Sequence, residues 1–115
     1  MSQAEETLNH HLQSFGEGNI DEIVADYTDD SVIIFESNLI KGLDNIRAFF
    51  SDFIGNTLPP GSEFEMKHTQ IVGYIAYIVW VASTDKLSFK LGTDTFVIID
   101  GKILQQTIAA LVEPK

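Results

Sequence analysis

The sequence contains no cysteine, which excludes a disulfide framework, a thiolate nucleophile and zinc-finger spacings. Basic residues are few, because 7 lysines and arginines stand against 17 aspartates and glutamates, and the formal net charge is −10. A field of this sign repels phosphate backbones and anionic headgroups. Nucleic acid and membrane surfaces are therefore not expected as partners.

Long hydrophobic runs are also missing. The longest, 71-IVGYIAYIVWVA-82, is shorter than the roughly 20 residues that span a bilayer, and it is typical of a buried strand. The N-terminus, MSQAEETLNHH, has acidic residues and no apolar core, so it does not fit a signal peptide and we expect a cytoplasmic location. The length of 115 residues and the apolar content of 44% predict one domain over residues 1–115.

The N-terminal half shows helical patterns. Ser2 to Glu5 matches a capping box, and apolar-face positions then recur at i, i+3, i+4 and i+7, at Leu8, His11, Leu12 and Phe15. His10 points away from that face, so we expect it to be solvated and without a special role. Asn19 caps a short second helix, a strand follows at 31–36, and Gly42 opens a third helix.

After the breaker Pro59-Pro60-Gly61, four strands are predicted, at 63–72, 75–82, 87–99 and 102–112. Asp100-Gly101 is the strongest hairpin signal in the chain. Strand 63–72 alternates, which places Phe64, Met66 and His68 on one face. Strand 75–82 is apolar on both faces, so we expect the convex face of the sheet to bury a second subunit in a two-fold dimer.

Three helices followed by a meander predict an α+β fold with the helices on one face of an antiparallel sheet. Long strands with an internal glycine such as Gly92 bend, so the sheet should be strongly curved and form a hollow cone around the helices.

Three phrases in this order, 11-HLQSFGEGNIDEIVADYTDDSVIIF-35, 42-GLDNIRAFF-50 and 94-DTFVIIDGKI-103, resemble the nuclear-transport-factor-2-like (NTF2-like) superfamily, in its SnoaL-like and ketosteroid-isomerase-like branch. The resemblance implies a cone-shaped, cystatin-like fold with three N-terminal helices, a ligand pocket inside the cone and frequent homodimers.

The resemblance also implies roles for particular residues. In the isomerases, a tyrosine and a protonated aspartic acid hold the developing oxyanion while a second aspartate moves the proton, which is a worked example of pKa tuning. His11 aligns with that tyrosine and Asp94 with the hydrogen-bond-donating aspartic acid. Phe35 occupies the position of the proton-moving aspartate, and Glu36, one residue later, belongs to the opposite face of the strand. Ketosteroid isomerisation is therefore not expected.

The candidate catalytic residues are His11, as general acid or base, and Asp94, as its partner or as a neutral donor. The alternative is that His11 is a buried structural residue with a satisfied hydrogen bond. The expected pocket wall consists of Phe15, Tyr27, Phe35, Phe50, Phe53, Trp80 and Phe96, and such a wall suits a small apolar or polycyclic molecule. The alternative for these aromatic side chains is plain core packing. His68 is either a second polar group in this pocket or exposed at the sheet edge, and Trp80 could instead face outward.

No histidine spacing suited to a metal and no nucleotide or flavin motif is present, so we expect neither metal nor cofactor. Two functions stay open. The first is a cofactor-free SnoaL-like isomerase, cyclase or hydratase/dehydratase that works by proton transfer. The second is a non-catalytic ligand-binding or protein-interaction module.

Overall fold

Three helices precede most of the sheet in the computed structural model, which describes residues 2–115. Helix α1 (Gln3–Glu17) begins at Ser2, whose hydroxyl accepts a hydrogen bond from the Glu5 amide at 3.1 Å, and it ends at Gly18 in the left-handed conformation. Helix α2 (Ile20–Val24) is capped by Asn19. Helix α3 (Leu43–Asp52) continues into a π-helical turn, η1 (Phe53–Thr57). The three predicted helices are confirmed.

The sheet has six strands in the spatial order β2-β1-β6-β5-β4-β3. Their bounds are β1 (Tyr27–Phe35), β2 (Asn38–Lys41), β3 (Glu63–Val72), β4 (Ile75–Ser83), β5 (Leu87–Ile99) and β6 (Lys102–Pro114). All neighbouring pairs are antiparallel except β1 and β6, which run parallel. The predicted α+β class is confirmed. The sheet, however, is mixed and not purely antiparallel as predicted, because β1 and β6 lie side by side but are far apart in the sequence, and no hairpin forces them to run in opposite directions.

The four-residue strand β2 is not predicted by the sequence, because it is too short for an alternation to be visible. It pairs with β1 through the turn at Glu36 and Ser37, and Glu36 takes a positive φ of 58° there. Glu36 is exposed in this turn, away from the interior. The predicted hairpin at Asp100-Gly101 is present, with φ values of 52° and 75°.

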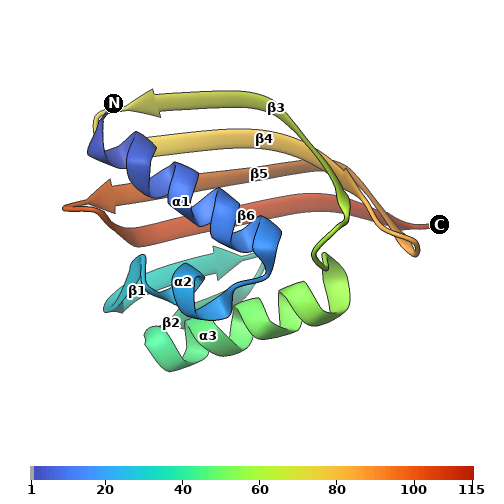
Figure 1. Cartoon of the computed structure of the whole chain (residues 1–115), viewed down its shortest axis with the longest axis horizontal. Coiled ribbons are helices and arrows are strands. Elements are labelled where there is room, and N and C mark those ends of the chain that lie inside the picture. Colours follow the sequence, from blue (N-terminus) through green and yellow to red (C-terminus); the bar gives the residue numbers. More distant parts are fainter. Residues whose placement is uncertain (1) are drawn as a thin grey trace.

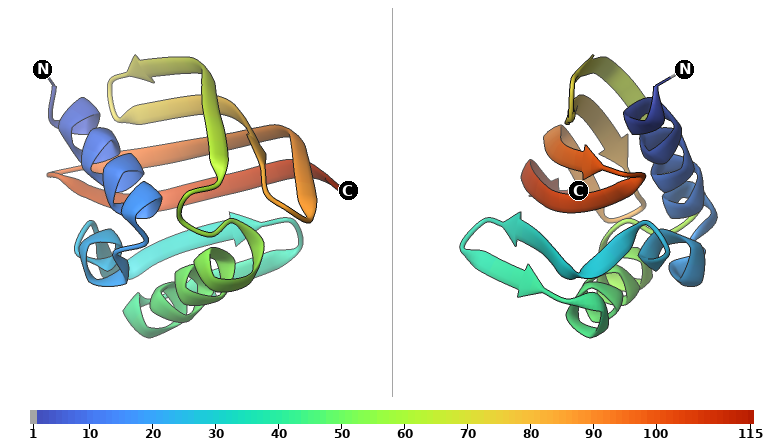
Figure 2. Two further views of the ribbon diagram at one scale, coloured as in Figure 1. Left: turned by 45° about the vertical axis from the view of Figure 1, so that its right-hand side comes forward. Right: turned by 90° about the vertical axis from the view of Figure 1, so that its left-hand side faces the viewer.

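The helices lie on the concave face of the curved sheet, with α1 crossing in front of the long strands and α3 lying near β1 and β2 (Figure 1). Turning the molecule shows how the strands bend around this helical layer (Figure 2). The core fills the space between the two layers, and its fully buried members include Leu8, Ile46, Phe50, Ala76 and Phe96. No helix within residues 2–115 is long and apolar enough to cross a membrane.

A bulge in β3 reverses the faces of that strand. Met66 pairs with Trp80 but His68 pairs with Val79, so Lys67 is the extra residue. Paired residues share a face, and Trp80 faces the concave interior while Val79 faces outward. The prediction that His68 shares a face with Phe64 and Met66 is therefore wrong, and His68 lies exposed on the convex side.

Candidate functional site

A cavity of about 160 Å³ lies between the concave face of the sheet, α1, α3 and the loop at 58–62. Its wall is mainly apolar, and the aromatic side chains in it are Phe15, Phe49, Phe50, Phe53, Phe64 and Trp80. Three buried polar side chains also line it, His11 from α1, Asp94 from β5 and Gln106 from β6. The sheet, the two helices and the loop thus leave an apolar pocket with a few convergent polar groups, which is the usual character of a small-molecule site.

Asp94 is held at this cavity by two N–H donors. The Trp80 indole donates to Oδ1 and the Gln106 amide donates to Oδ2, both at 2.9 Å. Burial raises the pKa of Asp94 to about 6, against the two hydrogen bonds, which lower it. The carboxyl group therefore titrates close to neutrality and is mostly ionised at pH 7.

The position of the Trp80 indole depends on Gly92, its partner across β4 and β5. A Cβ atom at position 92 would lie 2.2 Å from Trp80 Cε2, so only glycine leaves room for the ring there. The sequence predicts a bend at Gly92, but the close approach of the indole is the stronger reason for a glycine.

Gln106 connects Asp94 to a second aromatic residue. It is 2% exposed, and its Oε1 accepts a hydrogen bond from the Tyr27 hydroxyl. Burial, followed by the negative charges of Asp94 and Asp26, raises the pKa of Tyr27 well above its usual value, so this hydroxyl stays protonated. Gln106 is not among the site residues predicted from the sequence. The sequence feature that could have pointed to Gln106 is its spacing of two residues from Ile108, which places both side chains on one face of β6.

His11 is 3% exposed and lies among the rings of Phe15, Tyr27, Phe50 and Phe96, with centroid distances of 6.4, 6.1, 5.9 and 5.3 Å. Burial, and then the nearby charge of His10, lower its pKa to about 4, so its ring is neutral at pH 7. Its Nδ1 is buried without a hydrogen-bond partner among the described residues. His11 and Asp94 line the same cavity, but no hydrogen bond joins them within residues 2–115.

His10 differs from the sequence prediction. Its Nδ1 lies 2.6 Å from Asp26 Oδ2 and its Nε2 lies 3.4 Å from Glu22 Oε1. The hydrogen bond with Asp26 is the largest cause that raises the pKa of His10. His10 is partly solvated, with 40% of its side chain exposed, but the expectation that it has no role is wrong, because it ties α1 to α2 and to Asp26, the residue before β1.

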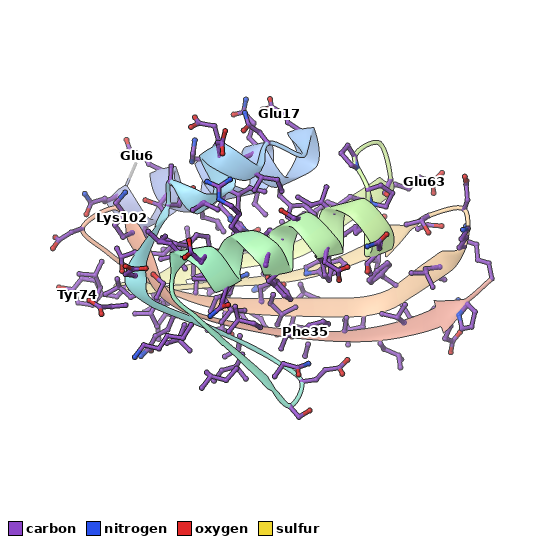
Figure 3. The ribbon with its side chains drawn as sticks, turned by 90° about the horizontal axis from the view of Figure 1, so that it is seen from below. Glu6, Glu17, Phe35, Glu63, Tyr74 and Lys102 are labelled. Atoms are coloured by element: carbon purple, nitrogen blue, oxygen red, sulfur yellow. The ribbon has the colours of Figure 1, made fainter. Side chains whose placement is uncertain are left out.

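Several expected wall residues lie outside the cavity. Tyr27 and Phe96 are buried beside His11, and His68 is on the convex side. Phe35 packs against Phe49 and Phe53 near α3 (Figure 3), with ring centroids 5.9 and 6.1 Å apart. The cavity therefore keeps Phe15, Phe50, Phe53 and Trp80 from the predicted set, and Trp80 faces inward.

No group of three or more histidine, aspartate or glutamate side chains suited to a metal ion occurs within the part of the chain that the structure describes. The polar residues of the cavity are one neutral imidazole, one carboxyl group and one amide, with Ser62 in the loop. This set can exchange protons and hydrogen bonds with a ligand.

Comparison with protein families matches residues 8–106 to the SnoaL-like domain. Comparison with curated proteins gives no match. Among solved structures, an NTF-2 like protein of unknown function from Burkholderia xenovorans is 21% identical, covers 94% of this chain and 82% of its own, and has a TM-score of 0.78.

Two similar structures are enzymes. SalBIII, an epoxide hydrolase/cyclase-like enzyme in pyran ring formation of the polyether salinomycin, is 15% identical and covers 97% of this chain and 95% of its own, with a TM-score of 0.80. An LEH-like epoxide hydrolase of M. tuberculosis is 16% identical and covers 95% and 83%, with a TM-score of 0.75. Identities this low establish a shared fold and no more.

Proposed function

This chain belongs to the SnoaL-like domain family, and on that premise we propose that it is a cofactor-independent enzyme that transfers a proton on a compact, uncharged molecule. The observation that carries the proposal is the Asp94 carboxyl group, buried on the wall of an apolar cavity with both oxygens held by N–H donors. Such an arrangement fixes a proton acceptor in one orientation and removes it from bulk water.

Asp94 is the general base in this proposal. A pKa of about 6 leaves it ionised at neutral pH and close enough to neutrality to accept a proton efficiently. It takes the proton from an O–H group or an acidic C–H group of the bound molecule. His11, neutral because its pKa is about 4, supplies a hydrogen bond to the ligand oxygen on which negative charge develops.

The cavity limits the size and charge of the ligand. Its volume of about 160 Å³ is close to that of an engineered cavity of about 150 Å³ that binds benzene, so the enclosed space suits about one six-membered ring. No lysine or arginine belongs to the described lining, and the chain has a net charge of −10, so an anionic ligand would be repelled. Small epoxides, hydroxy-epoxides and ketones fit these limits, and the two enzymes of similar fold act in epoxide hydrolysis and pyran ring formation.

A second candidate is a non-catalytic binding module. The observation in its favour is that both oxygens of Asp94 already accept hydrogen bonds from Trp80 and Gln106, as expected of a structural anchor. Phe35, at the position of the proton-moving aspartate, supplies no second carboxylate.

The two candidates differ in turnover. The purified protein is incubated with single-ring epoxides, hydroxy-epoxides and enolisable ketones, and NMR in D₂O follows ring opening, ring closure and exchange of acidic C–H protons. We expect conversion that Asp94→Asn abolishes and that Asp85→Asn, an exposed carboxylate replaced in the same way, retains. Thermal stabilisation without conversion would favour the binding module, and neither effect across the panel would refute the proposed enzyme.

We also propose that the convex face of the sheet pairs two copies of the chain. Large apolar side chains are exposed on this face, at Ile34, Leu39, Val72, Ile75, Leu91 and Leu111. Leu91 and Leu111 are direct cross-strand neighbours on β5 and β6, the two middle strands of the sheet. Light scattering at micromolar concentration should give a dimer, and Leu111→Glu should give a monomer while Ser51→Glu, on the helical side, should not. A monomeric wild-type protein would defeat the dimer.

A further inference from the structure

We propose that Gln106 and Tyr27 are positioning residues that keep Asp94 in the role of a proton acceptor, because they form a buried chain in which the Tyr27 hydroxyl donates to the Gln106 amide and the amide donates to the carboxylate. The inference deepens the proposed function and rests on it. Neither residue has to touch the ligand for this role, since both act on the ligand through the protonation state of Asp94.

An amide side chain can face a carboxyl group in two ways. Its NH₂ end donates hydrogen bonds and its carbonyl end only accepts them, and the two ends have nearly the same shape. Packing alone therefore does not choose between the two orientations of Gln106.

The ionised Asp94 carboxylate makes the choice, because it only accepts hydrogen bonds. The chain is completed by the Tyr27 hydroxyl, which can donate or accept. It is buried and protonated, and its partner in the structure is Gln106 Oε1, a carbonyl oxygen that can only accept. With the carbonyl end occupied by this donor, the NH₂ end is directed to Asp94 Oδ2 at 2.9 Å. The donors along the chain Tyr27–Gln106–Asp94 thus all point toward the carboxylate.

The consequence for Asp94 is chemical. Two N–H donors, from Trp80 and Gln106, stabilise the ionised carboxylate against the cost of its burial. A reversed amide would present a carbonyl oxygen to Oδ2, and that contact is favourable only when the carboxyl group is protonated. In the reversed state Asp94 would be a proton donor, so the observed direction of the chain from Tyr27 to Asp94 is the one that suits a base.

The backbone holds the three groups in place. Tyr27 begins β1, and Gln106 lies in β6, the strand that pairs with β1 in parallel. Gln106 is also the direct cross-strand partner of Phe96, two residues from Asp94 on the same face of β5. The titratable neighbours are Tyr27 itself and His11, which is neutral at pH 7 and lines the same cavity.

The test is a titration of Asp94 by ¹³C NMR of its carboxyl carbon, in the protein without substrate. Gln106→Met removes one N–H donor, so the pKa of Asp94 should rise by roughly one unit. Gln106→Glu keeps the length of the side chain but replaces the donor by a second carboxyl group, so the rise should be larger. Tyr27→Phe removes the donor that polarises the Gln106 amide, so it should raise the pKa of Asp94 as well, by less than Gln106→Met.

Two matched controls lie on the convex side of the sheet. Gln105→Met changes the adjacent glutamine of β6, and Tyr77→Phe removes a hydroxyl from β4; both should leave the titration of Asp94 unchanged. An unchanged Asp94 titration in folded Tyr27→Phe and in either folded Gln106 variant would overturn the inference. The titration needs no substrate, so a protein that converts nothing in the panel fails the proposed function without affecting this result.

Discussion

The free energy of unfolding of Asp94→Asn, minus that of the wild type, should be larger at neutral pH than at acidic pH. The folded state raises the pKa of this carboxyl group from 3.8 to about 6. Folded protein therefore binds the proton more tightly than unfolded protein, and unfolding releases a proton between about pH 4 and pH 6. The free energy of unfolding of the wild type contains a contribution from Asp94 that falls as the pH rises through this window.

The magnitude follows from the shift of about two pKa units, which corresponds to about 3 kcal/mol over the whole window. By the linkage relation, about 2 kcal/mol of this contribution to the stability of the wild type is lost between about pH 4.5 and pH 7.5. Asparagine cannot ionise, so this cost is missing in the variant. Any loss of the hydrogen bonds from Trp80 or Gln106 in the variant adds an offset that does not depend on the ionisation of position 94.

The assay is urea denaturation followed by far-UV circular dichroism at several pH values, for wild type and Asp94→Asn side by side. Dichroism is preferable to tryptophan fluorescence because the only tryptophan is itself bonded to Asp94. The free energy of unfolding of the variant minus that of the wild type should increase by about 2 kcal/mol from about pH 4.5 to pH 7.5. A difference that stays constant with pH would show that Asp94 has an ordinary pKa and is not the poised base proposed above.

Two other substitutions test neighbouring parts of the same site. In His11→Gln, the difference from wild type should change in the opposite direction, because the folded state lowers the pKa of His11 from 6.5 to about 4. It should change by about 2 to 3 kcal/mol in favour of the variant as the pH falls from about 7.5 to 4.5. A flat difference would contradict a neutral buried ring. Gly92→Ala should cost roughly 1–3 kcal/mol in urea denaturation at pH 7 because the new Cβ atom displaces the Trp80 indole. Gly16→Ala, which meets nothing within 4 Å and lies in α1, should not destabilise the protein, and equal behaviour of the two variants would refute the steric argument.

The sequence predicts those parts of the fold that depend on local chemistry. The cap at Ser2, the helical spacing that includes Leu8 and His11, and the turn at Asp100-Gly101 are each settled by neighbouring residues, and the structure contains them. It does not predict features that depend on a distant strand. The bulge at Lys67 turns His68 outward and the parallel pairing of β1 with β6 makes the sheet mixed, and neither has a signal within its own segment.

The same distinction explains the site. Alignment and periodicity are enough to select His11 and Asp94, because each is a polar residue at an inward position. What each can do is decided by groups far away in the chain, since Asp94 depends on donors 14 and 12 residues away and Gln106 depends on a hydroxyl 79 residues away. Burial moves the two pKa values in opposite senses, upward to about 6 for Asp94 and downward to about 4 for His11. Near pH 7 the cavity therefore holds an ionised carboxyl group and a neutral imidazole, and this pairing of acceptor and uncharged donor suits proton transfer on a neutral ligand better than the binding of an ion.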